Sequence, residues 1–144
     1  QPIFQLRSQC GNISHDVDCE QVLGGLETLE DRVHRANLNG EHVANVLARN
    51  PHVRELFYPG HASHPDYDIA ISQMRGFGGV VSFRIDAQDL HDVAAFTDAF
   101  VEAAPAGTFI APSFGDLIRL SCGTIPPQHL TDALQAGFEA MARR

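Results

Sequence analysis

The sequence contains no lysine, since all ten of its basic residues are arginines. Chemistry that needs a lysine amine, such as a Schiff base with a carbonyl compound, therefore cannot be carried by a side chain of these 144 residues. Tryptophan is absent as well, and cysteine, methionine and tyrosine are scarce. The apolar fraction of 44% nevertheless argues against disorder and favours one domain with a hydrophobic core.

Cysteine is too sparse for a disulfide framework or a zinc site. Cys10, Cys19 and Cys122 are odd in number and lack metal-binding spacing. Adding His61 or His64 would still leave the site without a second close cysteine pair. We therefore expect reduced thiols, a cytoplasmic protein and no metal site.

Positively charged residues are also few. The sequence has 10 basic and 18 acidic residues, which gives a net charge of −8 at pH 7. An acidic surface disfavours nucleic acid and anionic membranes as partners. No apolar run approaches the roughly 20 residues that cross a bilayer, so no membrane segment is expected. The chain begins at Gln1 without a methionine, which suggests a fragment, a processed product or an incomplete N-terminus.

The N-terminal third predicts a lead-in followed by a long helix. Residues 1–17 show little periodicity, and Asp18 is a good N-cap residue. The spacing of the apolar residues predicts one connector helix over 18–49 that leads to another element. Pro51 ends this helix after Arg49. A coiled-coil seam between subunits is the alternative. The apolar residues of its one face are Val22, Leu26, Leu29, Val33, Ala36, Val43 and Leu47.

The rest of the chain alternates strands and helices. Strands are expected over 53–58, 80–85 and 117–122, and a strand edge followed by a turn over 109–115. Helices are expected over 65–74, after an Asp86 cap, and after a Thr124 cap. The order predicts an α/β domain of the α+β type over 18–144, with no internal linker. It has a small antiparallel or mixed sheet with helices on one face, plus the long N-terminal connector helix. In the last strand Ile118, Leu120 and Cys122 face the core, and Leu117, Arg119 and Ser121 face the other way.

Residues 58–83 carry the most specific pattern. They read YPGHASHPDYDIAISQMRGFGGVVSF. This stretch resembles the YPGL.SHP…A..QM.GFGG..SF signature of the Cys/Met-metabolism family of pyridoxal-phosphate (PLP) enzymes, which includes cystathionine gamma-synthase, cystathionine gamma-lyase and methionine gamma-lyase. The glycines of the GFGG run are interpreted as backbone requirements, because the run lacks the spacing of a phosphate-binding loop.

The resemblance extends upstream through residues 24–53. They read GGLETLEDRVHRANLNGEHVANVLARNPHV, similar to the family's RGLKTL..R…...NA..VA.FL..HP.V. That helix joins the large cofactor domain to the small C-terminal domain of these fold-type I PLP enzymes. Gly24 and Glu27 replace the usual arginine and lysine, and both changes remove positive charge.

Arg119 and Ser113 are the candidate substrate-binding residues. Residues 115–123, GDLIRLSCG, resemble the family motif G.IRLS.G, whose arginine binds the alpha-carboxylate of the amino-acid substrate. A guanidinium suits this role because it grips a carboxylate through two parallel hydrogen bonds. The alternative is a surface ion pair of Arg119 with Asp116 or another acid. Ser113 resembles the serine of the family's S.GG.ES loop, beside substrate and cofactor.

A family segment is missing after that loop. Gly115 is followed almost at once by Leu117, whereas the family normally has a long active-site segment there. Either the segment was lost in evolution or it is a disordered loop that is left out here. No catalytic, PLP-binding or metal-binding residue is therefore assigned to this chain.

The resemblance implies a portion or subunit of a PLP-dependent carbon–sulfur lyase or synthase that acts on sulfur amino acids. PLP would belong to the complete enzyme, with no covalent bond to this chain. The implied partners are a lysine-bearing PLP large domain or subunit and an amino-acid substrate, in a homo- or hetero-oligomer. The alternative is a non-catalytic binding or assembly subunit derived from the same domain, so whether the chain serves an enzyme is left open.

Overall fold

The computed structural model describes residues 2–11 and 15–143, which divide into two compact units between Asp31 and Arg32. Residues 1, 12–14 and 144 lie outside the described residues, so the expected lead-in over 1–17 is described only in part. Its described part contains helix α1 (Pro2–Gln9), where little periodicity had been expected.

The connector consists of two helices, where one over 18–49 had been expected. Helix α2 spans Asp16–Glu27 and α3 spans Leu29–Ala48, with Thr28 between them. The backbone of Thr28 leaves helical geometry, at φ −109° and ψ 6°. Asp18 is not the N-cap: α2 starts after His15, whose N–H donates to the Asp18 carboxylate.

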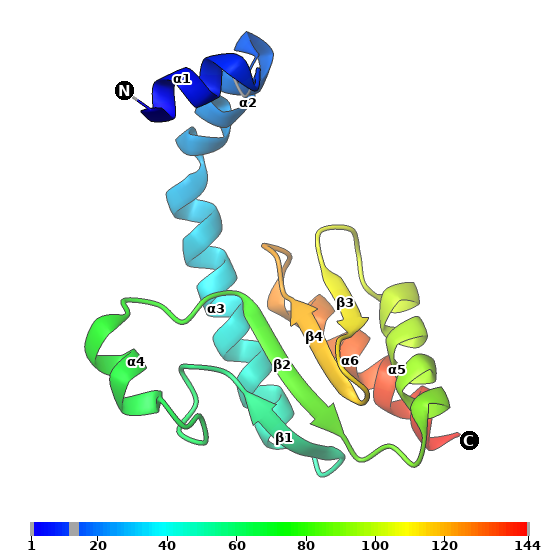
Figure 1. The fold of residues 1–144 in the computed structure, drawn as a ribbon. Helices are drawn as coiled ribbons and strands as arrows, with labels where there is room; N and C mark the ends of the chain where they lie inside the picture. The colour runs from blue at the N-terminus through cyan, green and yellow to red at the C-terminus, as the bar shows by residue number, and fades with distance from the viewer. Residues whose placement is uncertain (1, 12–14, 144) are drawn as a thin grey trace. The chain divides into compact units, whose positions relative to one another are not determined.

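The C-terminal unit contains a four-stranded sheet, and every neighbouring pair of its strands is antiparallel (Figure 1). Its strands are β1 (Val53–Phe57), β2 (Val80–Ile85), β3 (Phe109–Pro112) and β4 (Leu117–Ser121), in the order β1-β2-β4-β3. The expected sheet is confirmed as the antiparallel form. Besides α3, the helices of the C-terminal unit are α4 (Tyr67–Gln73), α5 (Leu90–Ala103) and α6 (Pro127–Ala142).

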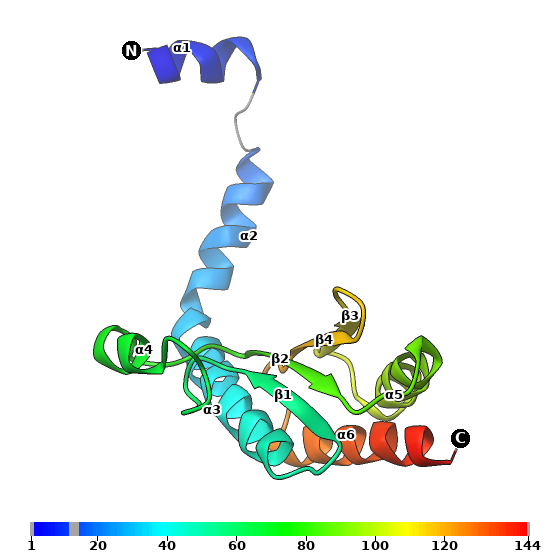
Figure 2. The same cartoon turned by 60° about the horizontal axis from the view of Figure 1, so that its bottom comes forward.

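One face of the sheet is covered by helices. Figure 2 shows α3, α5 and α6 on the same side of the four strands. The alternation expected for β2 and β4 is confirmed, because Val81, Phe83 and Ile118 are fully buried. Phe96 of α5 packs edge-on against Phe83 and against Phe138 of α6, which joins sheet and helices into one core.

Three further expected helix starts were wrong. Asp89, not Asp86, caps α5 by accepting hydrogen bonds from the backbone N–H groups of His91 and Asp92. The N–H of Asp86 instead donates to the His52 carbonyl. Likewise α6 follows Pro126 and not a Thr124 cap, with proline at its first position. Finally, α4 begins at residue 67, two residues later than expected.

Among the described residues, none of the helices has the length and apolar character needed to cross a membrane.

Candidate functional site

The candidate site lies on the open face of the sheet, which we define as the face opposite α3, α5 and α6 (Figure 2). Arg119 of β4 is placed there by strand alternation, because its neighbours Ile118 and Leu120 are fully buried. Its side chain is exposed. The expected orientation of Arg119 away from the core is therefore confirmed.

A tight turn joins β3 to β4 at the edge of this face. The Ser113 N–H donates to the Leu117 carbonyl at 2.6 Å, and the Leu117 N–H donates to the Phe114 carbonyl at 3.1 Å. Gly115 adopts φ +60°, a conformation that glycine tolerates without steric cost. The two strands thus pair up to the turn.

Ser113 and Arg119 lie on the same face of the hairpin formed by β3 and β4. Arg119 is directly opposite Ala111, and Ser113 follows Ala111 by two residues. Diagonal positions of this kind have Cα atoms about 7 to 8 Å apart. The turn therefore brings together the two residues that the sequence singled out.

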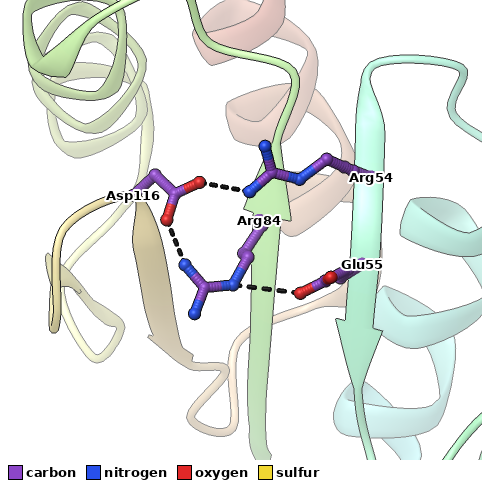
Figure 3. Close-up of polar contacts among 4 residues, drawn as sticks. All are labelled: Arg54, Glu55, Arg84 and Asp116. Atoms are coloured by element: carbon purple, nitrogen blue, oxygen red, sulfur yellow. Dashed lines mark hydrogen bonds and ion pairs between the residues drawn. The ribbon is translucent and has the colours of Figure 1, made fainter.

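Asp116 is held by two other arginines, and not by Arg119. Figure 3 shows one carboxylate oxygen of Asp116 paired with Arg54 and the other paired with Arg84. The Nε atom of Arg84 also lies 3.0 Å from a carboxylate oxygen of Glu55. Across residues 2–11 and 15–143, the Arg119 guanidinium has no ion pair. The alternative reading of Arg119 as the ion-pair partner of Asp116 is therefore wrong.

A β-bulge explains how the network forms. The register between β1 and β2 shifts between Val53 and Glu55, so Arg54 is the extra residue on β1. Arg54 and Glu55 are consecutive, yet both contact the Arg84–Asp116 pair (Figure 3). None of these contacts was expected from the sequence. No local motif marks the bulge, and the contacts depend on a strand order that spacing does not reveal.

The network lowers the pKa of Asp116. Desolvation raises this pKa, but the charge of Arg84, a backbone hydrogen bond and the bond and charge of Arg54 outweigh it and hold the pKa below its ordinary value. Asp116 is therefore ionised at neutral pH and neutralised by its partners. Arg119 is left as a cation with no acid bound to it in the described part of the chain.

Other polar groups form local structure instead of a catalytic constellation. The Ser63 hydroxyl lies 2.8 Å from Nδ1 of His61, but the same His61 nitrogen also accepts from the Ser63 N–H, which closes a short turn. Within the described ranges, no group of three or more histidine, cysteine or acidic side chains could hold a metal ion.

Comparison with known proteins decides the family. The sequence profile described as "Cys/Met metabolism PLP-dependent enzyme" matches residues 1–120. The chain belongs to the Cys/Met metabolism family of PLP-dependent enzymes. The family expected from residues 58–83 is thus confirmed, together with its dependence on PLP.

Curated relatives of this family are much longer than the chain. Cystathionine gamma-synthase 1, chloroplastic, of Nicotiana tabacum is 46% identical over 94 residues, covering 65% of this chain and 16% of the relative. Cystathionine gamma-synthase of Mycobacterium leprae (strain TN) is 40% identical over 104 residues, covering 71% of this chain and 27% of the relative. The chain therefore spans about a sixth to a quarter of the length of these relatives.

Solved structures share the fold. Apo methionine gamma lyase from Micromonospora echinospora is 29% identical with a TM-score of 0.81, over 91% of this chain and 38% of that one. Cystathionine gamma synthase from Xanthomonas oryzae pv. oryzae, in complex with cystathionine, is 26% identical with a TM-score of 0.74, over 84% and 37%. The α+β fold is therefore that of a part of these enzymes.

The residues of this family member do not fit covalent attachment of PLP. Family enzymes hold the cofactor as a Schiff base with a lysine amine, and all ten basic residues here are arginines. Arginine stays protonated at any ordinary pH and does not supply the free amine that the bond needs. No step of PLP chemistry is assigned to these side chains.

Proposed function

We propose that the chain is the small-domain portion or subunit of a PLP-dependent carbon–sulfur lyase or synthase that acts on sulfur amino acids by elimination or replacement. Within it, Arg119 binds the alpha-carboxylate of the substrate and Ser113 lies beside that group. One observation carries this proposal: Arg119 is exposed on the open face and has no acidic partner among the described residues, while Asp116 is occupied by Arg54 and Arg84. Its cation is thus available to a ligand.

The exposure of Arg119 also favours a partner protein that covers the open face. A carboxylate bound by an arginine in full contact with water is weakly held, because solvent and salt screen the charges. Covering the face lowers the local dielectric and strengthens the same contact. The proposed partner is a lysine-bearing PLP domain or subunit, which also supplies the amine that this chain lacks.

The assembly can be tested by purifying the protein in its native state. Intact mass spectrometry identifies the polypeptides present, and visible absorption reports bound PLP. We expect a yellow complex that contains a lysine-bearing PLP polypeptide of the same family. A colourless assembly of this chain alone would refute the proposal.

The role of Arg119 can be tested in that complex. Arg119→Ala removes charge-assisted hydrogen bonds normally worth about 1.5 to 3 kcal/mol, so KM for the amino acid should rise about 10- to 100-fold. Arg143→Ala is the matched control, because Arg143 lies after α6 and pairs with Glu139. An unchanged KM in Arg119→Ala would remove Arg119 from the site.

A second candidate function is a non-catalytic binding or assembly subunit that kept the fold and lost the active site. The closed Ser113–Asp116 turn and the absence of lysine favour it. This candidate predicts a colourless homo-oligomer whose assembly and partner binding are unaffected by Arg119→Ala. The two candidates therefore give opposite results in the same purification.

A further inference from the structure

Arg119 belongs to a row of four side chains that crosses the open face. Strand pairing places Phe57 opposite Ser82, Ser82 opposite Arg119, and Arg119 opposite Ala111. Side chains that are directly opposite on antiparallel strands share a face and have Cβ atoms about 4.5 to 5.5 Å apart. The Ser82 hydroxyl is therefore an immediate neighbour of the Arg119 side chain.

Ser82 has hydrogen-bonding capacity to spare. It is partly exposed, while its strand neighbours Val81 and Phe83 are fully buried on the other face. Within residues 2–11 and 15–143, its hydroxyl makes no hydrogen bond. A serine hydroxyl is one donor and two acceptors, so both roles remain open to a ligand. On the far side of Arg119, the paired residue Ala111 carries only a methyl group.

The acidic residues of the open face do not compete for this position. Both oxygens of Asp116 are taken by Arg54 and Arg84, and Glu55 contacts the Nε of Arg84 (Figure 3). An anion with two or more acceptor oxygens satisfies a guanidinium and an adjacent hydroxyl together, through charge-assisted hydrogen bonds. A carboxylate fits this description.

We propose that Ser82 is a second substrate-binding residue, which donates its hydroxyl hydrogen to the carboxylate that Arg119 binds. This inference rests on the proposed function, because it assigns a second donor to the same site. The guanidinium neutralises the carboxylate, and the Ser82 hydroxyl fixes its orientation across the strand pair. Ser82 thereby favours an acid over the corresponding amide.

The test uses the native assembly and three probes, which are L-cystathionine, L-cysteine and L-methionine. Each acid is compared with its amide, which lacks the charge of the carboxylate. Ser82→Ala should raise the Kd or KM of the acids about 10- to 100-fold, the loss expected for one hydrogen bond to a charged group, and change the values for the amides little. Ser82→Thr keeps a hydroxyl and a strand-favouring side chain, so it should restore most of the loss.

The controls separate this inference from the proposed function. Ser72→Ala on α4, where the hydroxyl bonds the Ile69 carbonyl, should leave every value unchanged. If Arg119→Ala weakens binding of the acids and Ser82→Ala does not, the Ser82 inference is wrong and the proposed function stands. If neither variant weakens binding, or if the wild-type assembly binds no acid of the panel, both are wrong. An equal loss for acids and amides in Ser82→Ala would mean a structural effect and would also overturn the inference.

Discussion

At the scale of single residues, three arginines on one sheet face have different surroundings. Arg54 and Arg84 share Asp116. Arg119 lies on β4 two residues after Leu117, which is opposite Arg84 in the sheet, and it has no acidic partner in the described part of the chain. The alternative considered for Arg119 from the sequence was an ion pair with Asp116 or another acid. The decisive contacts come instead from β1 and β2, more than 30 residues away along the chain.

The Asp116 network predicts a loss of stability in acid. The pKa of Asp116 is lowered in the folded state, so its contribution is present above the unfolded pKa of about 3.9 and disappears as the pH falls through the lower folded value. Asp116→Asn should therefore reduce the urea midpoint at pH 7 and flatten its decline below about pH 4. An equal decline of the urea midpoint with falling pH in wild type and variant would contradict this. Asp68→Asn on α4 serves as a control.

Cys122 and Tyr58 predict the opposite behaviour in alkali. Burial raises the pKa of Cys122 to about 12, and burial, Glu41 and Cys122 raise the pKa of Tyr58 to about 12. Both groups stay protonated in the folded protein but ionise in the unfolded chain. The free energy of unfolding is therefore fully retained below the pKa values of the unfolded chain and falls as the pH rises above about 9. The urea midpoint should decline there, and by less in Tyr58→Phe. A flat alkaline profile would refute this assignment.

Thiol accessibility provides an independent check on the same core. Cys10 and Cys19 are exposed, whereas Cys122 is fully buried and a thiol rather than a thiolate. A colorimetric disulfide reagent at pH 8 should react rapidly with two thiols per folded chain and with the third only after denaturation. Cys122→Ala should remove only the slow phase. Three fast thiols would show that the β4 strand end is open in solution.

At the scale of elements, α3 and the GFGG segment pack unusually closely. The Asn37 side chain accepts a hydrogen bond from the Gly78 N–H at 2.8 Å, and Tyr58 donates to the Gly78 carbonyl at 3.1 Å. A Cβ atom on Gly40 would overlap that carbonyl oxygen. The glycines thus let a helix and an extended segment approach at backbone distance, which agrees with the interpretation of the GFGG run as a backbone requirement.

This contact predicts opposite effects for two glycine substitutions in helices. Gly40→Ala should destabilise the fold by about 1 to 3 kcal/mol, because the new methyl group has no room beside Gly78 and the Tyr58 hydroxyl. Gly24→Ala, on α2, meets nothing within 4 Å and should instead increase helix stability by about 0.5 to 1 kcal/mol. Chemical denaturation measures the first effect, and circular dichroism the second. A neutral Gly40→Ala would mean that the two elements separate easily.

The strands were more predictable from sequence than the helix ends. Alternation of apolar residues located Val80–Ile85 and the buried face of β4 correctly, because period two is a local property of the chain. The α5 start was wrong because several aspartates compete as caps and only tertiary geometry selects Asp89. For the site, the motif identified Arg119 and Ser113, but Ser82 and the Asp116 network required strand order and the bulge in β1.

At the scale of the whole molecule, family membership and composition point in different directions. The family depends on PLP, yet the chain offers no lysine and spans a minor share of its relatives. We therefore predict that the purified chain with added PLP will not turn over cystathionine, cysteine or methionine. Product assays in the presence and absence of the lysine-bearing companion measure this. Turnover by the chain alone would contradict the division of labour proposed above.

The four-residue connection between β3 and β4 has a practical consequence for engineering. Its ends are hydrogen-bonded to each other, so the pairing of β3 with β4 is already closed before the turn, and within the turn only Asp116 contacts other strands, through Arg54 and Arg84. Lengthening a surface connection costs little free energy, about 0.6 kcal/mol for each doubling of its length. The hairpin is thus a natural insertion point. A longer segment from a relative could be grafted between Ser113 and Asp116, which keeps the contacts of Asp116 with Arg54 and Arg84, to ask whether an activity appears with it.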